Sequence, residues 1–190
     1  TTVYALDRGS DNFDVIDAYP ERDLYRYAYR GEWAPTEGVV VEPVVERLRV
    51  VKGNSVSLET EFEVPEEATS VVAVLHNETE TTYEEVGVGD DGNATVEWRL
   101  NSSAVKVADG DSLDVDERGE AVLEVTVTKR YDSFRYRQEL SYETEGDGVR
   151  VTAPPYTELC YSFELCDGES VHVGDGITTE AVADVPEEEP

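Results

Sequence analysis

Residues 121–143 are the stretch that most restricts the fold of this chain. They form two runs in which apolar and polar residues alternate, and a short polar break at residues 130–133 separates the runs. The apolar positions are 123, 125 and 127 in the first run and 134, 136, 140 and 142 in the second. Because this alternation is typical of a strand with one buried face, the stretch predicts a β-hairpin with one face in the core and the other in water.

The rest of the chain repeats the same pattern. The clearest alternation runs from Val56 to Val64, and about ten strand candidates are separated by turns rich in Gly, Asp, Asn and Pro. No amphipathic helix longer than two turns is expected. The pattern predicts an all-β fold, an antiparallel β-sandwich or single jelly roll with an N-terminal arm. We divide the chain into an arm at 1–37 that is partly strand, with apolar runs at 3–6 and 15–19, a β-sandwich domain at 38–183 and an acidic tail at 184–190.

The charge of the chain restricts its habitat and its partners. It has 44 acidic and 15 basic residues, a formal net charge of -29, and only three of the basic residues are lysines. A carboxylate-rich, lysine-poor surface is typical of proteins from halophilic archaea, since molar salt shortens the Debye length to about 3 Å and removes most of the self-repulsion. An ordinary acidic secreted domain is the alternative. Either origin argues against nucleic acid as a direct partner, because phosphate binding needs clustered cations.

One segment of the arm combines arginines with aromatic residues. On a strand, its arginines lie on one face and its tyrosines on the other. We interpret the segment as an interface arm whose arginines pair with carboxylates, in preference to a nucleic-acid patch. We expect its aromatic side chains to be buried, either on the chain's own domain or on a neighbouring chain. The members of this interface arm are Arg22, Tyr25, Arg26, Tyr27, Tyr29, Arg30 and Trp33.

The two cysteines, Cys160 and Cys166, are six residues apart in a strand-like segment. Six extended residues span about 20 Å, whereas a disulfide requires Cα atoms within about 7 Å. A bond between them therefore needs a turn near Ser162 and Phe163, and nothing in the sequence suggests one. The cysteines are interpreted either as small buried apolar residues or as disulfide links between subunits.

The sequence contains no constellation that carries chemistry. It has no nucleophile, phosphate-loop, dinucleotide or zinc-protease motif, and neither histidine stands at a ligand-type spacing from the cysteines. We therefore expect no catalytic residues, no metal site, no cofactor and no enzymatic activity. Three sequons, at Asn77, Asn93 and Asn101, lie at strand ends or turns and are candidate N-glycosylation sites. Chance is an equal account of them in a chain with this many Ser and Thr residues.

Taken together, these features resemble those of one family. The features are the strands from Val39 to Leu165, the acidic lysine-poor surface, the absence of methionine and the strand with Cys160 and Cys166. In these features the chain resembles the smaller major capsid protein of icosahedral, internal-membrane viruses of halophilic archaea. The resemblance implies a single vertical jelly roll located in the virion shell. It also implies that this jelly roll packs with copies of itself and with a second, larger capsid subunit, above a viral membrane or membrane protein. The cysteines would then link subunits.

Two other functions fit the same sequence. A glycosylated cell-surface or secreted β-sandwich module of a haloarchaeon, such as an adhesin or a surface-layer domain, would use the three sequons and would be extracellular. A viral spike or decoration protein would share the fold and the habitat. A signal peptide or lipid-attachment motif encoded before Thr1 would favour the surface module.

Overall fold

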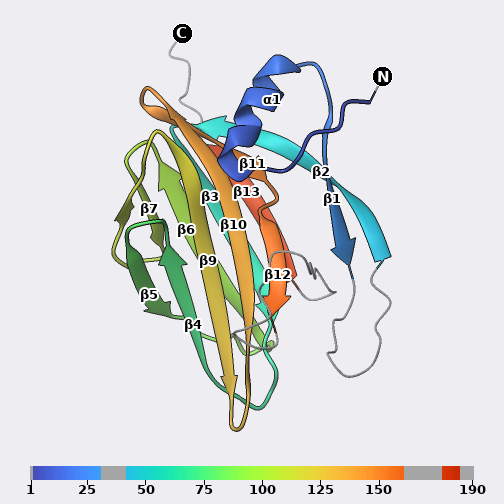
Figure 1. Ribbon diagram of the computed structural model, residues 1–190. Coiled ribbons are helices and arrows are strands. Elements are labelled where there is room, and N and C mark those ends of the chain that lie inside the picture. The colour runs from blue at the N-terminus through green and yellow to red at the C-terminus, as the bar shows by residue number, and fades with distance from the viewer. Residues whose placement is uncertain (1, 31–41, 161–176, 185–190) are drawn as a thin grey trace.

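The computed structural model describes residues 2–30, 42–160 and 177–184, and the fold below is that of these residues. They form a short 3-10 helix η1 (Gly9–Asp11), one α-helix α1 (Asn12–Ala18) and thirteen strands (Figure 1). The strands are β1 (Leu24–Arg30), β2 (Glu42–Gly53), β3 (Ser55–Glu63), β4 (Ala68–His76), β5 (Thr81–Glu85), β6 (Asn93–Asn101), β7 (Ala104–Val107), β8 (Leu113–Asp114), β9 (Arg118–Lys129), β10 (Ser133–Glu145), β11 (Gly148–Ala153), β12 (Tyr156–Cys160) and β13 (Ile177–Asp184).

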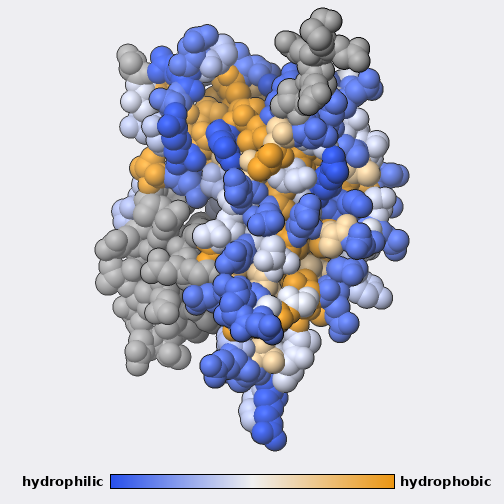
Figure 2. All heavy atoms as spheres, turned by 180° about the vertical axis from the view of Figure 1, so that it is seen from behind, coloured by the Kyte–Doolittle hydropathy of each residue, from blue (hydrophilic) through white to orange (hydrophobic). Residues whose placement is uncertain are grey.

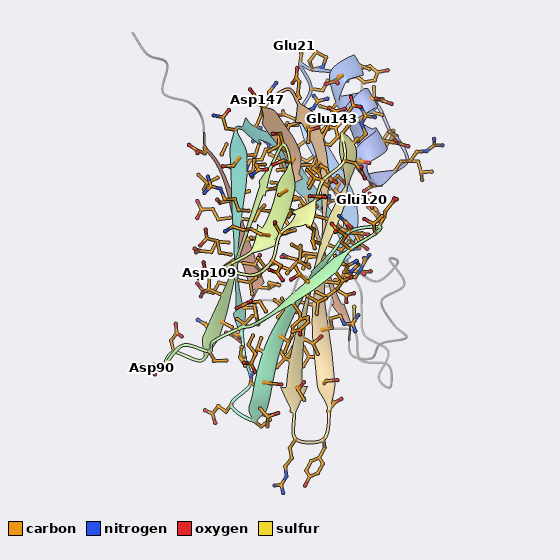
Figure 3. The ribbon with its side chains drawn as sticks, turned by 90° about the vertical axis from the view of Figure 1, so that its left-hand side faces the viewer. Glu21, Asp90, Asp109, Glu120, Glu143 and Asp147 are labelled. Atoms are coloured by element: carbon orange, nitrogen blue, oxygen red, sulfur yellow. The ribbon has the colours of Figure 1, made fainter. Side chains whose placement is uncertain are left out.

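The strands form two antiparallel sheets that pack face to face. The larger sheet has eight strands in the order β1-β2-β11-β10-β9-β4-β5, with β12 also paired to β10, and the smaller has five in the order β13-β3-β6-β7-β8. Figure 3 shows the two layers side by side, with α1 on the outer side of the larger sheet. The predicted β-sandwich is therefore confirmed. Some strands that are consecutive in sequence pair as hairpins within one sheet, such as β4 with β5 and β9 with β10. Others pair with strands far away in the sequence, such as β2 with β11 and β4 with β9.

The core lies between the sheets and follows the alternation of the sequence. In β9 and β10, which form the predicted hairpin, Leu123 faces Gln138 and Val125 faces Tyr136. Alternate residues of β6 are likewise buried, and the largest of them is Trp98, which is 1% exposed. The side chains between the sheets thus come from the positions that the alternation assigns to a core face.

The core also contains a hydrogen-bonded polar network that joins the two sheets. Gln138 of β10, which is 2% exposed, accepts a hydrogen bond from the Thr60 hydroxyl at 2.9 Å. Its Nε2 donates to the hydroxyls of Thr179 at 2.8 Å and Thr157 at 3.2 Å. Thr60 and Thr179 also bond each other at 3.1 Å, and Thr157 donates to the carbonyl of Pro155 at 3.2 Å. A network whose members are all bonded fixes the relative position of the sheets without leaving a buried polar group unpaired.

The outer face of the smaller sheet is acidic. Glu59 in β3 lies directly opposite Glu97 in β6 and opposite Glu180 in β13, and all three side chains are exposed. We call these three residues the glutamate row. Viewed from behind, on the side of the smaller sheet, the surface is mostly hydrophilic (Figure 2). Like charges directly opposite each other on neighbouring strands destabilise a sheet, so this face is more stable where salt screens them.

The N-terminal arm differs from its prediction in one element. Residues 15–19 were interpreted as an apolar strand-like run, but Val15 to Ala18 belong to helix α1 and Tyr19 ends it. The helix buries Phe13 completely against the sandwich. The arm also supplies β1, which pairs with β2 at one end of the larger sheet, so the described part of the arm packs on its own domain.

Candidate functional site

The outer face of the larger sheet carries a cluster of arginines and carboxylates. In the predicted hairpin, Arg135 bonds Glu124 at 2.8 Å and Arg137 bonds Glu139 at 2.7 Å. Arg137 also lies 3.6 Å from Glu158 of β12, which is only 1% exposed. This face was predicted to lie in water, and these residues are only partly open to it, since the four hairpin side chains are between 18% and 29% exposed. Ion pairs of this depth are screened less by salt than pairs on an open surface.

Arg26 of β1 extends the cluster toward the edge of the sheet. Its side chain is 10% exposed, lies 5.6 Å from the centre of the Tyr156 ring, and donates hydrogen bonds to Glu46 at 3.4 Å and to the carbonyl of Pro154 at 3.3 Å. Burial, followed by the charge of Glu158, raises the pKa of Tyr156 well above its usual range. Tyr156 therefore stays protonated and donates to Glu158 at 3.3 Å, which suits a structural role better than proton transfer.

A second cluster holds the arm in place. Arg150 of β11 stacks on the ring of Phe13 at 4.8 Å and donates two hydrogen bonds of 2.7 Å to Asp17 of α1. Arg118 of β9 bonds Asp14 at 2.9 Å, and both arginines also bond Glu143, which points toward α1 in Figure 3. The hydrogen bonds to Asp17 raise the pKa of Arg150 and hold that of Asp17 below its ordinary value. We call these residues the arm clamp.

Glu120 of β9 contacts the beginning of the arm. Its carboxylate lies so close to the backbone at Gly9 that a β-carbon there would collide with it. Gly9 has a φ of 60°, a conformation that favours glycine. Burial, followed by the charge of Glu139, raises the pKa of Glu120, so these two surroundings disfavour the charged form of the carboxyl.

The interface arm lies in the structure with its faces reversed from the prediction. Tyr25 and Tyr27 were expected to be buried, but they are 56% and 63% exposed, while Arg26 on the other face is buried. Tyr27 lies opposite Val45 of β2, which is 66% exposed. We call Tyr25, Tyr27 and Val45 the exposed apolar patch. Arg22 precedes β1 and stacks on Tyr19 at 5.6 Å.

The remaining members of the interface arm cannot be compared with the prediction. The side chains of Tyr29 and Arg30 and the whole of Trp33 lie outside the described residues.

The apolar patch is exposed because β1 and the beginning of β2 project beyond the smaller sheet, as Figure 1 shows. The smaller sheet ends at β13, where the carbonyl of Ala181 accepts a hydrogen bond from Arg49 of β2 at 2.9 Å. Residues 45, 25 and 27 lie beyond that contact on the same face of the larger sheet. Their side chains therefore lie past the edge of the smaller sheet.

The predicted cysteine and glycosylation sites have defined surroundings. Cys160 is 2% exposed and disulfide-bonded, so its thiol is not available for a link between subunits while that bond holds, and Cys166 lies outside the described residues. The side-chain oxygens of Asn77 and Asn101 accept backbone hydrogen bonds from residues two and three positions later. The Nδ2 of Asn93 donates to Glu61 at 3.1 Å. Each asparagine thus stabilises a turn or strand end without a glycan, and glycosylation stays a prediction.

Two further features, metal-binding groups and membrane-spanning helices, concern only the described ranges. Within them, no three His, Cys, Asp or Glu side chains are grouped so as to hold a metal ion. No helix there is long and apolar enough to cross a membrane.

Sequence reasoning missed the arm clamp and the burial of the arginine and carboxylate cluster. The signal that could have found the cluster is the charge pattern of the hairpin, in which Arg137 lies directly opposite Glu124 and Arg135 lies two residues before Arg137 on the same face. Cross-strand neighbours of opposite charge attract each other. No local signal links Arg150 to Asp17, because 133 residues separate them.

The fold and these clusters define a β-sandwich whose N-terminal arm is clamped to one face by arginines. Residues 1–140 match a family model described as "Domain of unknown function (DUF7846)". Since the match covers well over half of the 190 residues, the chain belongs to this family. The matched stretch includes the arm and ends within β10. No significant match was found among curated proteins or among solved structures.

Proposed function

We propose that this chain is a structural unit that works by binding other protein chains in concentrated salt. The observation that carries the proposal is the exposed apolar patch at the end of the larger sheet, where Tyr25, Tyr27 and Val45 are 56%, 63% and 66% exposed and lie side by side on two paired strands. Tyrosines are enriched at protein interfaces because they combine a large apolar ring with a polar tip. The patch is therefore suited to a protein partner.

The form of this function that we favour is a capsid building block of a virus of halophilic archaea, located in the virion shell and packed with copies of itself and a larger subunit. Support comes from the acidic surface, with its glutamate row, and from the clamped arm, which leaves β1 presented at the edge of the sandwich. A subunit of this kind needs a rigid body and adhesive edges but no catalytic group. The ion-pair clusters on the outer face of the larger sheet provide the rigid body.

A glycosylated cell-surface or secreted module is the second candidate, and the bonded state of Cys160 is compatible with it, as it is with a virion protein. Disulfides persist in oxidising exteriors, which include cell surfaces as well as virions. In this form, the exposed apolar patch would bind a neighbouring module of a surface protein, and Asn77, Asn93 and Asn101 would carry glycans.

Light scattering after size-exclusion chromatography in molar KCl tests the proposal, with intact mass spectrometry on the same sample. Capsid subunits should associate as protein concentration rises and should carry no glycan mass. A glycosylated monomer would support the surface module instead. A monomer without glycan at every concentration, which binds no protein through the patch, would contradict both forms.

A further inference from the structure

A pocket of about 520 Å³ lies where the loop between α1 and β1 passes β2. Residues of the segment 19–24 line it, together with residues 47–50 of β2 and Ala153 at the end of β11. At this point β2 changes its neighbour, since it pairs with β1 up to Leu48 and with β11 from Arg49. Small-molecule sites measure about 300–1,000 Å³, so the pocket has the size of a binding site.

The pocket has a charged end and an apolar end, because residues from both faces of β2 line it. Successive residues of a strand point to opposite faces. Arg49 donates a hydrogen bond to the carbonyl of Ala181 in the smaller sheet, so Arg47 and Arg49 lie on the face toward that sheet. Leu48 and Val50 therefore lie on the face that carries α1. A ligand in the pocket meets arginines at one end and aliphatic side chains at the other.

Aliphatic side chains form the apolar end. Ile16, Leu24 and Leu48 are half-buried and Val50 is 36% exposed, and all four line the pocket. Part of their surface is therefore still in contact with water. An apolar ligand that covered it would be stabilised by the removal of this surface from water.

The charged end is positive in a strongly negative chain. Arg22, Arg47 and Arg49 line the pocket with a single carboxylate, Asp23, whereas the whole chain has 44 acidic and 15 basic residues. Arg47 pairs with Asp23 at 2.7 Å, but these side chains are 70% and 63% exposed, and molar salt weakens so open a pair. A local excess of positive charge favours an anion over a neutral or cationic ligand.

Arg49 is the best placed of the three arginines to bind an anion. Among the described residues, its side chain bonds the carbonyl of Ala181 at 2.9 Å and pairs with no carboxylate. A guanidinium has five N–H donors, so one bond to a neutral acceptor leaves its charge and most of its donors open to a ligand. A carboxylate suits such a group, because its two oxygens accept parallel hydrogen bonds from the guanidinium fork.

We propose that this pocket binds a small organic acid, in which a carboxylate is joined to a short apolar body. The carboxylate pairs with Arg49, and the apolar body lies against Leu24 and Leu48. The exposed apolar patch does not line this pocket, so the inference goes beyond the proposed function and does not depend on it. The bound acid contacts the arm and β2 together and therefore stabilises the arm on the sheet.

Both ends of the pocket are needed for selectivity in concentrated salt. Chloride at molar concentration competes for the arginines and screens their charge, so charge alone does not select a ligand. Burial of apolar surface does not depend on charge and persists in salt. We therefore expect an acid with an apolar body to bind more tightly than either acetate or a neutral molecule with the same body.

The test uses 4-phenylbutyrate as the probe and follows its binding by ligand-observed NMR in molar KCl. The wild-type protein should bind one molecule per chain, about fivefold or more tightly than it binds 4-phenylbutanol, which has the same apolar body without the charge. Arg49→Gln keeps a donor for the carbonyl of Ala181 but removes the charge, so it should remove most of this preference. Arg99→Gln is the matched control, because Arg99 is 49% exposed, also bonds a neutral acceptor, and does not line the pocket.

A second pair of variants tests the apolar end. Val50→Trp fills part of the pocket from an exposed position and should weaken the binding of the acid and of the alcohol about fivefold or more. Val45→Trp is its control, because Val45 is exposed on the same strand outside the pocket. A wild-type protein that binds no 4-phenylbutyrate, or binds the acid and the alcohol equally well, would overturn the inference. Binding that both Arg49→Gln and Val50→Trp leave unchanged would also overturn it, since the acid would then lie elsewhere.

Discussion

The buried network around Gln138 allows a quantitative test of what joins the two sheets. Replacing Gln138 by Leu keeps the size of the side chain but removes its three hydrogen bonds, to Thr60, Thr157 and Thr179. Each threonine keeps one other partner, because Thr60 and Thr179 bond each other and Thr157 donates to Pro155. The variant thus lowers the number of hydrogen bonds in the core without leaving a hydroxyl wholly unpaired.

The expected loss follows from these contacts. Three hydrogen bonds of about 1 kcal/mol each, partly offset by the more favourable burial of leucine, give a decrease of about 2 kcal/mol in the free energy of unfolding. Adding Thr60→Val and Thr179→Val replaces the other polar groups by apolar ones of similar shape. The triple variant should then regain most of the loss and unfold within about 1 kcal/mol of the wild type.

Urea unfolding in molar KCl measures these differences. Urea is preferable to guanidinium chloride because guanidinium is a salt and would change the screening of the acidic surface. The fluorescence of Trp98, which is 1% exposed, reports the opening of the core. A single variant as stable as the wild type would refute the importance of the network. A triple variant less stable than the single one would show that packing, and not the hydrogen bonds that the threonine hydroxyls lose, sets the cost.

Two charge substitutions test the acidic surface and the arm. Glu59→Gln removes the central charge of the glutamate row. It should raise the free energy of unfolding by about 1 kcal/mol in dilute salt but hardly at all in molar salt. Glu63→Gln is the control, because the cross-strand neighbour of Glu63 is Asn93, and an equal effect of both variants would contradict the reasoning. Burial, followed by the charge of Glu139, raises the pKa of Glu120 in the folded state, so its contribution to stability is present at low pH and is lost as pH rises through that pKa. Glu120→Gln should therefore be neutral below about pH 4 and stabilising at neutral pH, and unfolding curves with no gain at neutral pH would exclude this.

The strands were predictable because their signal is local. Apolar and polar residues alternate in the hairpin of β9 and β10 and in the strand from Val56 to Val64, because each of these strands has one face in the core. Helix α1 has seven residues, too few for a helical period to stand out. Its stability comes from the sheet beneath it, through Phe13 and Arg150, and that contact is not visible in its own sequence.

The orientation of β1 shows a different limit. Alternation separates Tyr25 and Tyr27 from Arg26, but it does not say which face is covered. Which face of β1 is covered depends on where the smaller sheet ends. That sheet ends at β13, which follows β1 by more than 140 residues in the sequence. Tyrosine is more apolar than arginine, so a rule based on residue type buries the wrong face. The arginine is covered because Tyr156 and Glu46, from two other strands, surround it.

The glutamate row also limits the shapes that an assembly of this protein can take. Glu59, Glu97 and Glu180 lie abreast on one broad side of the molecule, so two copies that stack on this side would bring two such rows together and expel the water and counterions between them. The opposite broad side is partly covered by the clamped arm. Attachment is therefore favoured at the rims of the sandwich, and copies joined there would form a layer one molecule thick, with one surface that repels further layers.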